Sequence, residues 1–81
     1  MTFRRLCDLL GGDFQPGGAC ELPRVMLIVD VAGAVDNLMS VSFLGDTVKI
    51  RIDVDEGTAV IAGTIGDDDT LIDGTIALAT Q

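Results

Sequence analysis

Four aspartates lie close together near the end of the chain. The stretch Gly66–Gly74 holds Asp67, Asp68, Asp69 and Asp73. Carboxylates on a glycine-rich turn suit Ca²⁺, because such a turn lets side-chain and carbonyl oxygens reach one ion. These four residues are therefore the chain's candidate metal ligands.

The same stretch resembles the calcium-binding nonapeptide of β-roll repeats, and this resemblance implies a Ca²⁺ site. The stretch departs from that pattern by one extra Asp between Gly66 and Leu71. A β-roll also stacks several copies of its repeat, and here there is one. We interpret the aspartates as a solvated hairpin turn, and we expect no metal and no cofactor.

Cys7 and Cys20 are the two cysteines, and the chain has no His. Four nitrogen or sulfur ligands for zinc cannot be assembled from this set. A cysteine nucleophile would lack a His partner. A Cys7–Cys20 disulfide would pin the N-terminal segment into a loop. We favour two reduced, buried thiols instead, because we expect a protein made without export.

Other catalytic groups are scarce. The chain has no Tyr and no phosphate-binding glycine loop, and its single Lys, Lys49, lies in an alternating run. The carboxylates of Asp53, Asp55 and Glu56 are typical of solvent-facing turns. We predict that the protein is not an enzyme.

The net charge of −8 is unevenly distributed. Residues 1–24 are neutral, and residues 25–81 carry all of the excess. An acidic body does not bind nucleic-acid backbones or anionic membranes, which require clustered Lys and Arg. The apolar run Val25–Val35 contains Asp30 and is too short to cross a bilayer. We expect a soluble protein, located in a virion if it is viral and otherwise in the cytoplasm.

Residues 1–24 predict a short helix followed by an extended arm. Thr2 can cap a helix that ends at Gly11. Four glycines and a proline then make residues 11–18 irregular. A helix this short needs a docking surface, either its own sheet or a neighbouring molecule. The expected partner contacts of the arm are Phe3, Leu6, Leu10 and Phe14, and Leu9 belongs to the same apolar stripe.

Residues 25–81 predict about five antiparallel strands. Alternation is clearest in residues 47–54, where apolar and polar side chains take turns. The turns hold two to four residues, which indicates a meander that closes into a sandwich or small barrel. A helix within residues 32–44 is the alternative. The expected strands are residues 25–31, with an extension toward 35, and residues 38–44, 47–54, 58–65 and 70–80.

Two of these strands share a pentapeptide pattern. Ile61–Ile65 and Ile72–Ile76 both read Ile-x-Gly-Thr-Ile. On the second face of the first copy lie Val60, Ala62 and Thr64, all uncharged. A sheet face exposed to water normally carries charges, so we expect another layer or a partner chain to cover this one.

These features indicate an all-β protein that acts by assembly rather than by catalysis. We expect a small decoration or cement component of a virus or phage particle, which binds neighbouring protein subunits and forms a homo-oligomer. The alternatives are a Ca²⁺- or ligand-binding β module and an accessory subunit of a cellular complex.

Overall fold

The computed structural model describes residues 1–79, so Thr80, the last residue of the strand expected at 70–80, lies outside it. None of the helices in that range is long and apolar enough to cross a membrane. A 3₁₀ turn, Asp67–Asp69, precedes the last strand. The elements are α1 (Phe3–Leu9), β1 (Asp13–Phe14), β2 (Cys20–Glu21), β3 (Val25–Leu27), α2 (Ile28–Ala34), β4 (Met39–Leu44), β5 (Thr47–Val54), β6 (Gly57–Ile65) and β7 (Thr70–Leu78).

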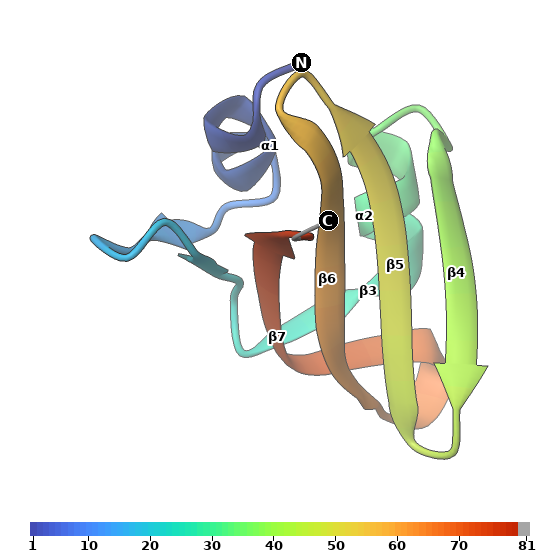
Figure 1. Ribbon diagram of the computed structural model, residues 1–81. Helices are drawn as coiled ribbons and strands as arrows, with labels where there is room; N and C mark the ends of the chain where they lie inside the picture. The colour runs from blue at the N-terminus through green and yellow to red at the C-terminus, as the bar shows by residue number, and fades with distance from the viewer. Residues whose placement is uncertain (80–81) are drawn as a thin grey trace.

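The described strands form one antiparallel sheet in the order β1-β2-β7-β6-β5-β4, and β3 also pairs with β7. The strands β4 to β7 run as a meander, with each strand beside the next (Figure 1). The predicted all-β class with a short N-terminal helix is thus confirmed. Strands β1 and β2 lie within the arm that was expected to be extended and irregular, and the sequence did not predict them.

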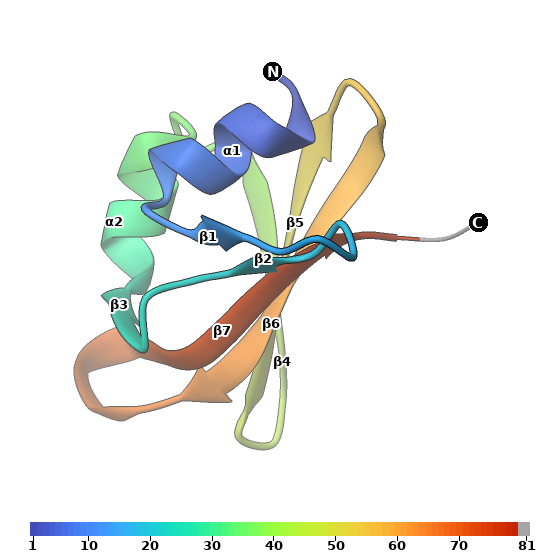
Figure 2. The same cartoon turned by 90° about the vertical axis from the view of Figure 1, so that its left-hand side faces the viewer.

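The core lies on one face of this twisted sheet. Val48, Ile50 and Ile52 alternate with exposed residues along β5, and all three are buried. Both helices lie on the side to which these residues point (Figure 2). The sheet and the two helices therefore enclose a single aliphatic core.

The strand predicted for residues 25–31 and its extension toward 35 are wrong beyond Leu27, where α2 begins. As a continuous strand, this run would place Asp30 on the same face as Met26 and Ile28. In the helix Asp30 is exposed in the first turn, where a carboxylate is favourable. Val31 and Val35, one helical turn apart, are then both buried.

The two glycines of the repeated pattern meet across β6 and β7. A Cβ on Gly63 would lie 2.6 Å from Cδ1 of Leu71 and 3.1 Å from Cα of Gly74. The register between β6 and β7 shifts at this point, and Asp73 takes a φ of 52°. The two backbones therefore approach closely here, and the approach accompanies a β-bulge.

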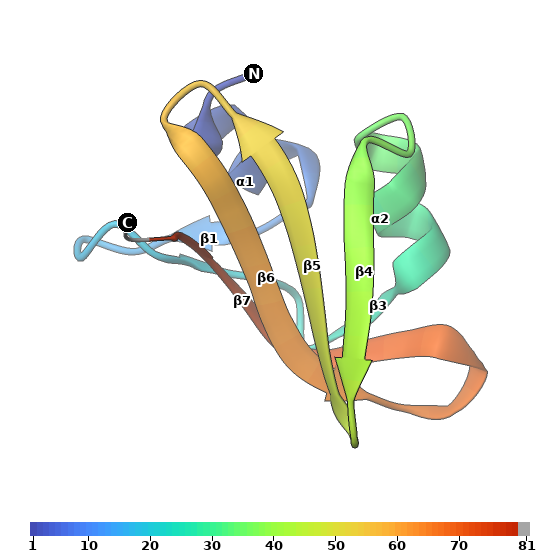
Figure 3. The same cartoon turned by 45° about the vertical axis from the view of Figure 1, so that its right-hand side comes forward.

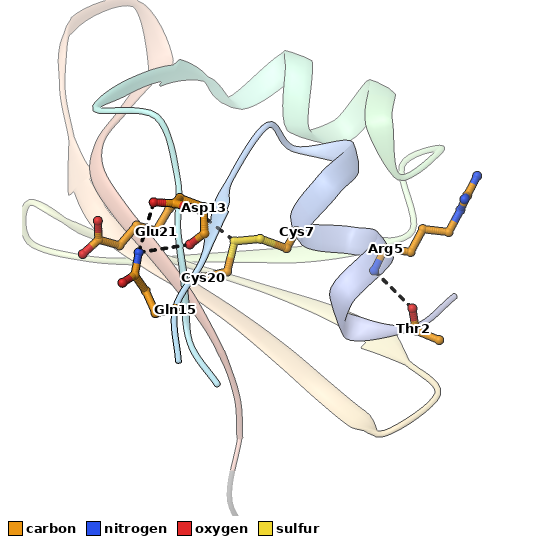
Figure 4. The surroundings of a disulfide bond; sticks show 7 residues. All are labelled: Thr2, Arg5, Cys7, Asp13, Gln15, Cys20 and Glu21. Carbon is orange, nitrogen blue, oxygen red and sulfur yellow. Dashed lines mark hydrogen bonds between the residues drawn. A yellow bond between two sulfur atoms is a disulfide. The ribbon is translucent and has the colours of Figure 1, made fainter. Parts of the chain in front are cut away.

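The expectation of reduced cysteines is also wrong. Cys7 and Cys20 form a disulfide between α1 and β2, and both residues are fully buried (Figure 4). Gly12 lies directly against both sulfur atoms, where a larger residue would clash. The short β1–β2 hairpin brings Cys20 back to the helix, a return that the sequence spacing alone does not reveal.

Candidate protein-interaction surface

The arm residues expected to contact a partner are packed within the chain itself. Phe3, Leu6 and Leu10 have exposed fractions of 3%, 0% and 5%. The rings of Phe14 and Phe3 pack edge to face, with centroids 6.1 Å apart. The guanidinium carbon of Arg4 lies 4.8 Å from the centre of the Phe14 ring. The arm is therefore docked on its own sheet, the first of the two docking surfaces considered from the sequence.

Two turn carboxylates hold the start of this arm. The backbone N–H of Phe3 donates to Oε1 of Glu56 at 3.0 Å, and the terminal amine of Met1 lies 3.2 Å from Oδ1 of Asp55. Figure 1 shows the N-terminus beside the β5–β6 turn. The sequence predicts these carboxylates to be solvent-facing turn residues. Nothing in the local sequence places the first helix beside that turn, so these two contacts could not be predicted.

The uncharged face of β6 points outward, away from the core. Val60 and Ala62 are half-buried and Thr64 is exposed. Directly beside them on β5 lie Arg51, opposite Val60, and Lys49, opposite Ala62. The long aliphatic stems of such cations cover neighbouring apolar surface. Coverage of this face by a partner stays a prediction.

The acidic turn does not form a cation cage. Asp67, Asp68 and Asp69 are exposed on the 3₁₀ turn. A carboxylate oxygen of Asp73 lies 3.9 Å from Nε of Arg24 instead. Within residues 1–79 no three acidic or cysteine side chains converge as metal ligands do. The turn therefore carries no metal proposal.

The largest exposed apolar side chains lie along and beside β4. Among residues 1–79, Leu44 and Leu38 are the two most exposed large hydrophobic residues, at 83% and 74%. Phe43, beside Leu44 on β4, is 60% exposed. Among the strands of residues 1–79, β4 pairs with β5 alone, so its other edge has no strand partner in that range. We define the β4 edge as residues 38–44.

Incomplete cover explains the exposure of Phe43. Phe43 lies opposite the fully buried Val48 and shares its face, yet every residue of β4 after Met39 is exposed. Helix α2 lies at the level of the first half of β4 (Figure 3). Accordingly, Met39 at the start of the strand is half-buried, whereas Phe43 near its end is not. The sequence signal that could have identified this edge is the lack of any charge in Met39–Leu44.

A shallow hollow adjoins the start of the β4 edge. Its volume is about 420 Å³, and it opens on the outer face of the sheet. Its polar groups come from three strands and do not converge as catalytic groups would. The hollow adjoins the β4 edge and is lined by Leu38, Met39, Ser40, Arg51, Asp53 and Thr58.

Comparisons with protein-family models, with curated proteins and with solved structures find no match to this chain.

Proposed function

We propose that the protein is a non-enzymatic assembly component that binds other protein subunits through the β4 edge. The supporting observation is a free, uncharged strand whose neighbouring apolar side chains stand in water. An exposed strand edge of this kind is a template for pairing with another chain. The arm, being docked in cis, has an internal role in this proposal.

In this proposal the assembly is a virus or phage particle, and the protein is a small decoration or cement component of it. The Cys7–Cys20 disulfide supports this setting over the cytoplasmic one, because disulfides persist on virion surfaces and are rare in reducing cytosol. The net charge of −8 supports protein partners over nucleic acid. An accessory subunit of a cellular complex would use the same edge with a different partner.

Recovery of the tagged chain from its natural source tests this function. We expect it to co-purify in fixed stoichiometry with a larger protein assembly, whose subunits mass spectrometry identifies. Replacing both Leu38 and Leu44 with Glu should abolish this recovery, because the charges would be desolvated at the interface. Val25→Glu is the matched control, since Val25 is an exposed apolar residue of β3, which pairs with β7 and lies away from the β4 edge.

A chain recovered from its source at its own mass, with no stoichiometric protein, would overturn the proposal. So would an assembly that retains the doubly substituted variant as well as it retains Val25→Glu.

A further inference from the structure

We infer that the β4 edge pairs with the β4 edge of a second copy, antiparallel, with Val41 opposite Val41 of the second copy. This inference rests on the proposed function and names one partner for the same surface. It joins two sheets into one continuous sheet across a twofold axis.

The β4 edge lacks the usual protection of a sheet edge. Natural edges are guarded by Lys, Pro, bulges or very short strands. Strand β4 spans six residues, pairs with β5 without a register shift, and contains no Lys, Arg or Pro. The outer strand at the other end of the sheet, β1, spans two residues. Of these two outer strands, β4 therefore offers the longer unpaired edge.

The hairpin fixes which backbone groups face outward. Leu44 and Thr47 close a two-residue turn, so they exchange hydrogen bonds with each other. Bonded and non-bonded pairs alternate along an antiparallel ladder. Ser42 and Ser40 therefore also bond to β5. The N–H and C=O groups of the remaining residues, Met39, Val41 and Phe43, point to the free edge.

A symmetric pair must match these outward groups with each other. Placing Val41 opposite its own copy also places Met39 opposite Phe43 of the second copy. All three bonding pairs then join residues whose N–H and C=O groups are free. Each such pair exchanges two hydrogen bonds.

This register also matches the side chains. By the same alternation, Leu38 comes opposite Leu44 of the second copy, and this happens twice by symmetry. These are the two most exposed large hydrophobic side chains of residues 1–79. Directly opposed apolar residues are the unit of sheet stabilisation. Ser40 comes opposite Ser42 of the second copy, so no charge is buried along the strand.

Charge explains why a second copy fits this edge. Two chains of net charge −8 repel each other over most of their surfaces. The six residues of β4 are neutral, so this strip allows close approach without burying a carboxylate. Asp36 and Asp46 lie in the turns at its two ends, where they face the turns of the second copy and limit the length of the pairing.

The interface is small. Pairing of one strand per copy buries less than the roughly 1,600 Å² of a standard interface. We therefore expect a dimer with a Kd on the order of micromolar to hundreds of micromolar. Measurements must cover that concentration range.

Sedimentation equilibrium of the full chain up to millimolar concentration tests the inference. One variant carries Leu38→Lys and Leu44→Lys, and the other carries Leu38→Glu and Leu44→Glu. Each should weaken dimerisation by at least about tenfold, because like charges meet twice across the axis. An equimolar mixture should dimerise again, because each Lys then meets a Glu. Both variants remain net negative, so net charge alone cannot produce this rescue.

Val25→Lys is the matched control and should dimerise like the natural chain, because Val25 is exposed on β3, away from the β4 edge. Oxidised Val41→Cys should form an intermolecular disulfide, since opposed bonded residues lie about 5.5 Å apart at Cα, within disulfide range. Val25→Cys should not. Unchanged far-UV circular dichroism confirms the fold of each variant.

A natural chain that stays monomeric at millimolar concentration would overturn the inference. So would a dimer that survives in both charged variants, or a mixture that shows no rescue. The proposed function fails separately. A monomer that still co-purifies with a larger assembly overturns the self-pairing alone, and a β4 dimer recovered without other proteins overturns the particle role alone.

Discussion

Individual side chains attach the N-terminal arm to the sheet. Glu56 accepts from the first N–H of α1, and Phe14 packs on Phe3 beneath the Arg4 guanidinium. Cys7 and Cys20 add a covalent link between the helix and β2. In a chain with few aromatic residues these contacts extend a small aliphatic core. The arm is thereby a structural part of the domain.

Removing the disulfide should destabilise the protein by about 3 kcal/mol, because the bond closes a loop of roughly 15 residues in the unfolded chain. We expect this loss for the Cys7→Ser and Cys20→Ser double variant in urea unfolding monitored by circular dichroism. Thiol titration of the unfolded natural chain should find no free thiol. Two free thiols per chain, or equal unfolding midpoints with and without reductant, would contradict the assignment.

The cysteine pairing shows a limit of sequence reasoning at this scale. The spacing of Cys7 and Cys20 fits either a bridge or two thiols. The bridge depends on the hairpin β1–β2 and on a glycine at position 12, which together bring the sulfurs into contact. Such a condition is set by tertiary packing, and local patterns do not contain it.

At the scale of elements, the ranges of the longer strands were predictable. Strands β4, β5 and β6 begin and end within one residue of the ranges expected for them, and β7 begins at Thr70 as expected. The run that became α2 is apolar apart from Asp30, and periodicity alone does not separate strand from helix in such a run. The lack of charge in Met39–Leu44 marks this strand, but its place at the edge depends on strand order, which is a property of the assembled sheet.

The docking of α1 on its own sheet can be tested with two leucines of that helix. Leu6→Ala should cost about 2–5 kcal/mol, because Leu6 is fully buried and its truncation leaves a cavity. Leu9→Ala should cost less than about 1 kcal/mol, because Leu9 is 45% exposed. Urea unfolding of both variants measures the difference. Equal effects would show that the helix does not dock as described.

Gly33 distinguishes a helix from a strand at α2. It is exposed, and a Cβ placed there meets no atom within 4 Å. Gly33→Ala should stabilise the protein by about 0.5–1 kcal/mol, as in other exposed helix interiors. Gly33→Val should be less stabilising than Gly33→Ala, because a β-branched side chain loses rotamer freedom in a helix. The opposite order in thermal unfolding would favour a strand.

The whole molecule combines an acidic surface with a neutral, apolar edge. Its charge of −8 favours repulsion between copies, while in the proposed pairing the β4 edge binds a strand of the second copy. The balance between these two tendencies sets how strongly the protein assembles. The acidic surface follows from the distribution of charged residues, and the unpaired edge follows from the strand order.

Salt should therefore strengthen self-association. Raising ionic strength from 0.01 M to 0.15 M shortens the Debye length from about 30 Å to about 8 Å and screens the repulsion between copies. We expect the dimer Kd to fall across this range in sedimentation equilibrium at constant pH. A Kd that rises with salt would indicate that ion pairs, rather than a neutral strand, hold the copies together.

Amide hydrogen exchange along β4 tests the pairing claim most directly. In the free chain the N–H groups of Ser40 and Ser42 bond to β5, whereas those of Met39, Val41 and Phe43 are open to water. We predict that exchange at these three open amides slows as protein concentration rises through the dimer Kd, while the two serine amides change little. Rapid exchange at Val41 that does not depend on concentration, up to the millimolar range, would contradict the account.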